Sequence, residues 1–71
     1  MKYLLVAAAA IVRHEYERKY RRMYVEATGI TKFTPFSFMI RALVKAKQID
    51  ISRRAKLLDR YRWLSEMMHA T

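Results

Sequence analysis

Residue types that commonly perform acid–base, nucleophilic or metal chemistry are few in this sequence and poorly placed for it. The two histidines, His14 and His69, stand near opposite ends of the chain, and there is no cysteine. Two imidazoles cannot complete a zinc shell without further ligands. A single glycine in the sequence also excludes a nucleophile elbow and a glycine-rich phosphate loop. The sequence therefore predicts a protein that is not an enzyme and that holds no cofactor or metal.

Tyrosines and arginines interleave between residues 13 and 24, and this pattern has three interpretations. Tyr16, Tyr20 and Tyr24 recur every fourth residue, with Arg13, Arg18, Arg21 and Arg22 among them. Such an array could stack on the bases of RNA and neutralise its phosphates. It could instead be one apolar stripe that packs on another helix, which we favour because the tyrosines continue the spacing of Val12. The third interpretation is a membrane interface, because aromatic and basic residues directly follow an apolar run.

That apolar run, residues 3–12, contains no polar side-chain group except the hydroxyl of Tyr3. As a helix it is about 15 Å long, half of a ~30 Å hydrocarbon core, so it is too short to span a bilayer. The single charge before it and the Ile-Val pair that ends it argue against a cleaved signal peptide, so we expect the segment to be retained. The candidate membrane- or partner-packing residues are Leu4, Leu5, Val6, Ile11, Val12, Tyr16, Tyr20 and Tyr24.

Length and charge limit the class of protein further. The chain has 71 residues, 15 Lys and Arg against 6 Asp and Glu, and a net charge of +9. A chain of this size makes one small domain with a marginal core, yet 54% hydrophobic residues is too many for a disordered basic tail. The bases are spread along the chain, and the densest run gives a candidate basic contact surface: Arg53, Arg54, Lys56, Arg60 and Arg62.

Periodicity predicts one long helix at the start of the chain, over residues 1–28. It is apolar on all sides at first and amphipathic after Arg13, and Gly29 provides its stop. On its charged side the order of acids and bases favours two pairs four residues apart, Glu15 with Lys19 and Glu17 with Arg21.

Two shorter helices are predicted after it, over residues 34–48 and 51–69. Thr34 is the expected cap of the first, with Pro35 in its first turn, and Asp50 or Ser52 the expected cap of the second. We expect Phe33 to pack back on Phe38 as a hydrophobic staple. Short joints predict antiparallel neighbours. The expected apolar sides are Phe36, Met39, Ile40, Leu43 and Val44, then Leu57, Leu58, Tyr61, Leu64, Met67 and Met68, with Trp63 near the edge of the second. Trp63 with Arg60 and Arg62 could mark a lipid-headgroup or RNA contact, but we favour it as the main packing anchor of the hairpin.

The expected fold is thus all-α, a single small helical subunit with one long N-terminal helix followed by a short helical hairpin. The hairpin is smaller than most domains that fold alone, so the long helix must fold onto it or reach other subunits. We expect a non-catalytic accessory subunit of a large membrane-associated assembly, such as a mitochondrial respiratory or ATP synthase complex in the inner membrane. Its partners would be other protein subunits and lipid headgroups. A bacterial or phage membrane assembly fits the same pattern.

Two other functions remain open at this stage. The first is a small basic ribosomal or RNA-binding protein, for instance of a mitochondrial ribosome, in which tyrosines and arginines contact nucleic acid. The second is a helical filler inside a filament or capsid.

Overall fold

The computed structural model describes residues 2–69, with side chains from Leu4 onward, and all of its regular elements are helices. They are α1 (Lys2–Thr28), α2 (Phe36–Lys45) and α3 (Ile51–Met68), and this part of the chain contains no strand. The predicted fold class, a long N-terminal helix followed by a short helical hairpin, is confirmed. Met1, in the first predicted helix, and the side chain of Tyr3 lie outside the described part.

Two helix boundaries follow the predicted signals. α1 stops at Gly29, whose φ of 74° lies in the left-handed region that glycine enters without steric cost. α3 begins after Asp50, whose carboxylate accepts hydrogen bonds from the backbone N–H of Ser52 at 3.4 Å and from its hydroxyl at 3.0 Å. Asp50 is therefore the N-cap.

α2 is shorter than predicted at both ends. Its N-cap is Pro35 instead of Thr34, whose hydroxyl donates to the carbonyl of Lys32. At the other end Lys47 has a φ of 60°, and the N–H groups of Lys47 and Gln48 donate to the carbonyls of Val44 and Leu43. These two bonds are a Schellman motif with lysine at the position that glycine usually occupies, so no glycine marked the end in the sequence.

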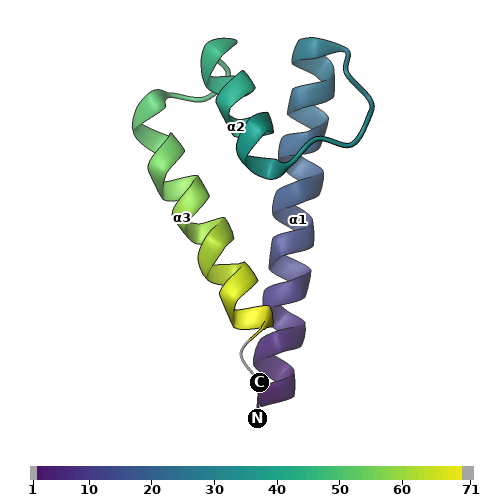
Figure 1. The fold of residues 1–71 in the computed structure, drawn as a ribbon, viewed down its shortest axis with the longest axis vertical. Coiled ribbons are helices and arrows are strands. Elements are labelled where there is room, and N and C mark those ends of the chain that lie inside the picture. Colours follow the sequence, from purple (N-terminus) through teal and green to yellow (C-terminus); the bar gives the residue numbers. More distant parts are fainter. Residues whose placement is uncertain (1, 70–71) are drawn as a thin grey trace.

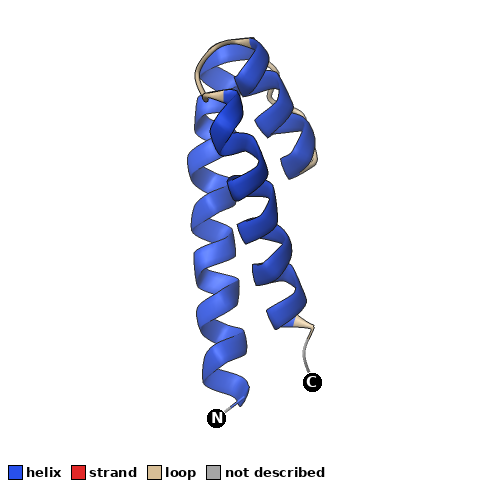
Figure 2. Cartoon of the chain, turned by 90° about the vertical axis from the view of Figure 1, so that its left-hand side faces the viewer, coloured by secondary structure: helices blue, strands red, loops and turns tan. Residues whose placement is uncertain are grey.

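The helices form an elongated bundle of 41 × 25 × 13 Å. α1 and α3 are antiparallel and come together near the two chain ends, while α2 packs against both of them at the opposite end (Figures 1 and 2). α2 and α3 are antiparallel, as predicted, but α2 runs in the same direction as α1, so that prediction is wrong for the first joint. The connection 29–35 turns back along α1; extended, it covers about 23 Å, more than the ~15 Å of α2.

The core lies where the three helices meet. Ile40 and Leu43 of α2 have no exposed surface, and aromatic contacts run from Tyr16 through Tyr20 and Phe36 to Tyr61. The Phe36 and Tyr61 rings are stacked with their centroids 4.1 Å apart. The residues that form the core cluster are Tyr20, Tyr24, Phe36, Met39, Ile40, Leu43, Ile49 and Leu57.

Two aromatic predictions are wrong. Trp63 is 59% exposed, because Leu57, Tyr61 and Leu64 define the inner side of α3 and Trp63 precedes Leu64 by one residue, a rotation of about 100°. The packing anchor of the small core is Phe36. Phe33 is 84% exposed and Phe38 also faces solvent, so they form no buried staple.

Candidate interaction surface

The structure divides the predicted packing residues of α1 into a covered and an uncovered group. Tyr20 and Tyr24 are buried in the core, and Tyr16 is half-buried with its ring edge-on to Tyr20 at 6.1 Å. These rings contact the protein's own helices. In this structure Tyr20 and Tyr24 have too little exposed surface to stack on a nucleic-acid base.

The uncovered group lies at the N-terminal end of α1. Leu4 is 67% and Ile11 64% exposed, and Leu5 and Val12 are also exposed, whereas Val6 is half-buried. Among residues 4–12, the one buried side chain is that of Ala9. Scattered single apolar residues are normal on a surface, but four large ones within three turns of one helix form a patch.

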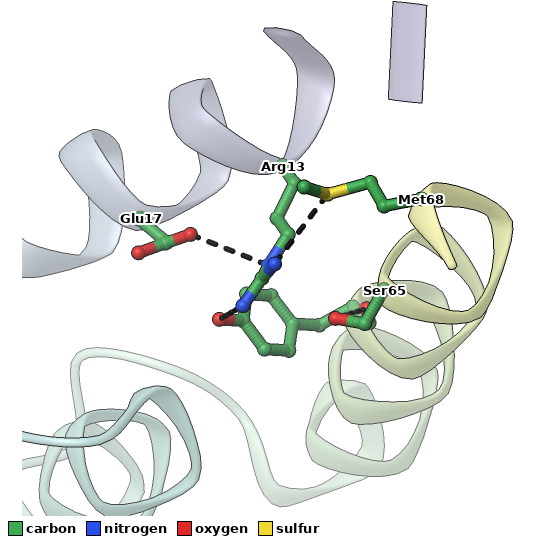
Figure 3. Close-up of polar contacts among 5 residues, drawn as sticks. Arg13, Glu17, Ser65 and Met68 are labelled. Carbon is green, nitrogen blue, oxygen red and sulfur yellow. Dashed lines mark hydrogen bonds and ion pairs between the residues drawn. The ribbon is translucent and has the colours of Figure 1, made fainter. Parts of the chain in front are cut away.

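Arg13 directly follows this uncovered end and reaches across to α3, as Figure 3 shows. Its guanidinium lies 5.0 Å from the ring centroid of Tyr61 and donates from Nη2 to the Tyr61 hydroxyl at 3.0 Å. Nη1 donates to the sulfur of Met68 at 3.4 Å, and Nε lies 3.4 Å from a carboxylate oxygen of Glu17. Nε is buried and makes no hydrogen bond to the described residues. Arg13 thus joins α1 to α3, 48 and 55 residues away in sequence.

The ion pairs on α1 differ from the predicted ones. Glu17 pairs with Arg13, and Glu15 lies 4.0 Å from Arg18. The predicted partner of Glu17, Arg21, instead donates to the carbonyl of Thr31. Arg13 also contacts Tyr61 of α3, and Arg21 contacts Thr31 of the 29–35 connection. Spacing within a single helix does not predict these contacts.

The predicted basic contact surface is split between two sides of α3. Arg53, Lys56 and Arg60 follow each other at spacings of three and four, so they share one side. Arg62 is turned away; it lies 3.7 Å from Glu66 in an exposed pair. Arg54, one turn before Leu58, is on that other side as well.

Arg60 contacts α1 from the side of α3 that it shares with Arg53 and Lys56. Its Nη1 donates to the hydroxyl of Tyr16 at 3.5 Å. This hydrogen bond raises the pKa of the Arg60 guanidinium, and the partial negative charge of the hydroxyl adds to the effect.

The Tyr16–Arg60 contact lies on a surface that combines apolar and basic residues of α1 and α3. Glu17 and Tyr61 line a groove beneath the 29–35 connection, and Tyr16 and Arg60, one residue earlier in each helix, are turned about 100° from them. The stripes that contain Tyr16 and Arg60 therefore meet on another side of the α1–α3 pair. We call this surface the α1–α3 face; its residues are Leu5, Val12, Tyr16, Lys19 and Met23 of α1 and Arg53, Lys56, Arg60, Trp63 and Met67 of α3.

The groove itself has a volume of about 450 Å³ and a largely apolar lining. Phe33 and Phe36 form part of its wall, and its polar groups come from Glu17, Thr34, Ser37, Tyr61, Arg62 and Ser65. No group of three or more His, Cys, Asp or Glu side chains that could hold a metal ion occurs among residues 2–69. The lining offers no nucleophile paired with a base.

Sequence reasoning missed the Arg13 cluster and the α1–α3 face. Both depend on the pairing of α1 with α3, which no local spacing encodes. The available signal was that apolar and basic residues recur three and four positions apart in both α1 and α3. This spacing fixes neither the direction nor the register of the helix pair.

None of the described helices is long and apolar enough to cross a membrane. Comparisons with protein-family models, curated proteins and solved structures find no match to this chain.

Proposed function

We propose that this protein is a non-catalytic accessory subunit of a large membrane-associated assembly, and that it acts by helix packing. The supporting observation is the uncovered apolar end of α1, where Leu4 and Ile11 are about two-thirds exposed. Burying these side chains against another protein would gain roughly 25 cal/mol for each Å² of apolar surface removed from water. In the remainder of α1 the apolar side chains pack into the protein's own core.

The charge balance supports the membrane setting. A net charge of +9 with exposed arginines suits a position next to anionic headgroups or acidic subunit surfaces. Among such assemblies we favour a mitochondrial respiratory or ATP synthase complex of the inner membrane, in which small basic subunits would bridge larger ones. A bacterial or phage membrane assembly would use the same surfaces.

Purification in mild detergent tests this proposal. A C-terminally tagged chain should bring down integral membrane proteins, which mass spectrometry identifies. Ile11→Asp should lose them, because an unpaired charge in an apolar site costs several kcal/mol. The matched control is Ile51→Asp, a change at an exposed isoleucine at the start of α3. Ala9→Asp is unsuitable, because Ala9 is buried within this chain and its replacement would disturb the fold itself.

Two outcomes would contradict the proposal. Equal recovery of companions with both aspartate variants would show that the apolar end of α1 is not the contact. Co-purification of ribosomal RNA and ribosomal proteins would favour the RNA-binding alternative. That complex should weaken steeply with salt, by roughly 10³-fold or more between 50 and 200 mM if about six phosphates are neutralised.

A further inference from the structure

We propose that the α1–α3 face binds the surface of an anionic lipid bilayer. This inference deepens the proposed function and rests on its membrane setting, because it names the lipid as a second partner beside the protein subunits. It uses a different surface feature, the combination of bases and apolar residues on two helices, and not the apolar end of α1 alone.

The charge of the face selects a negatively charged partner. Four of its ten residues are bases, Lys19, Arg53, Lys56 and Arg60, and they outnumber the two acids at its edges, Glu15 of α1 and Asp59 of α3. In α3 the nearest acid, Asp59, follows Lys56 by three residues and precedes Trp63 by four, so it lies at the edge of the face beside them. A second copy of this chain would place four bases against four bases, which disfavours a symmetric dimer through this face.

The distribution of residues along the face matches a bilayer surface. Because α1 and α3 are antiparallel, Leu5 and Val12 lie toward the same end as Trp63 and Met67, and Arg53 and Lys56 lie toward the other. Leu5, Val12 and Trp63 are exposed. Amphipathic surfaces of this composition enter the boundary between headgroups and acyl chains by roughly 5–10 Å, while Lys and Arg contact lipid phosphates.

Trp63 has a specific role in this arrangement. It is the only tryptophan, it is 59% exposed, and it lies between the apolar and the basic residues of the face. Tryptophan concentrates at membrane–water interfaces, because its ring is apolar and its N–H still finds a polar partner. A folded core does not require this ring, so its exposure agrees with contact at the headgroup level.

The test uses the purified full chain and the fluorescence of Trp63. Vesicles of equimolar phosphatidylcholine and phosphatidylglycerol should shift its emission to shorter wavelength in a saturable titration, and vesicles of phosphatidylcholine alone should not. The variant Lys56→Gln/Arg60→Gln should bind the anionic vesicles about 30-fold more weakly, since each base near such a surface contributes about fivefold.

The matched control is Arg41→Gln/Lys45→Gln, which removes the same charge from exposed positions of α2. These positions lie outside the α1–α3 face, so we expect a loss of less than about fivefold after ionic screening. Circular dichroism of both variants checks that the helices are intact. Equal losses in the two variants would overturn the proposal, because binding would then depend on net charge and not on this face.

Three other results would also overturn it. These are unchanged Trp63 emission with anionic vesicles, an emission shift that depends on protein concentration without lipid, and tighter binding to single-stranded RNA than to vesicles at equal salt. If vesicle binding fails while Ile11→Asp still abolishes co-purification in detergent, the lipid inference falls and the proposed subunit function stands.

Discussion

The first part of α1 is the more apolar of the two, yet it is the second part whose apolar side chains are covered. From Tyr16 to Tyr24 the apolar side chains enter the core, while Leu4, Leu5, Ile11 and Val12 remain largely exposed. The difference comes from α2 and α3: their buried side chains pack on the second part, whereas among residues 4–12 Ala9 alone is buried. An apolar segment therefore does not by itself show whether its side chains are buried within the chain, because that depends on which other helices pack on it.

The largest expected effect is on the packed part. Leu43→Ala should lower the free energy of unfolding by about 3 kcal/mol, because it opens a cavity at a side chain with no exposed surface. A domain of this size rarely has more than ~3–5 kcal/mol to lose, so the variant should retain no more than about 2 kcal/mol and be partly unfolded at room temperature. Urea unfolding followed by circular dichroism measures this. A loss below about 1 kcal/mol would show that the core is not the main source of stability.

Arg13 tests the boundary between the two parts. Arg13→Met should cost about 2 kcal/mol, because it removes hydrogen bonds from a charged donor that is mostly shielded from water. A double-mutant cycle with Tyr61→Phe isolates the bond across the α1–α3 pair, and we expect a coupling energy of about 1 kcal/mol. Additive effects of the two substitutions would mean that Arg13 and Tyr61 do not stabilise each other.

The end of α2 offers a smaller effect of the opposite sign. Lys47→Gly should stabilise the protein by up to about 1 kcal/mol, because it relieves a left-handed backbone conformation that costs about that much for a side chain with a Cβ. Lys45→Gly, within α2, is the control and should destabilise by about 0.5–1 kcal/mol. Thermal unfolding compares the two. Destabilisation by Lys47→Gly would indicate that the lysine side chain makes contacts that outweigh this strain.

The smallest effect is expected in the uncovered part. Leu4→Ala should change the free energy of unfolding by less than about 0.5 kcal/mol, since its side chain is 67% exposed. It is the matched control for Leu43→Ala, the same substitution in the packed part. A loss as large as that of Leu43→Ala in urea unfolding would mean that the isolated chain covers its own N-terminal end, and the contrast between the two parts of α1 would disappear.

Patterns with a local physical cause could be read from the sequence. The apolar side of α2 was predicted because Phe36, Ile40 and Leu43 repeat at helical spacing, and the end of α1 because Gly29 enters the left-handed region. The cap Asp50 belongs to the same kind of signal.

Features without a local cause could not be read. Lys47 ends α2 in a backbone conformation typical of glycine, so the residue type did not indicate where the helix ends. The direction of α2 depends on how the 29–35 connection folds back, and the contacts of Arg13 join residues about fifty positions apart. Of the candidate surface, the sequence supplied the residue types and the separate stripes. Their meeting at Tyr16 and Arg60 required the tertiary structure.

The pairing of α1 with α3 also has a consequence for the newly made chain. The ribosome releases α1 first, yet a major packing partner of α1, α3, begins at Ile51. Until Leu57 and Tyr61 have been synthesised, Tyr16, Tyr20 and the apolar residues before them lack that cover. Exposed apolar surface of this kind promotes aggregation, so the chain is most prone to aggregate before α3 has packed on α1.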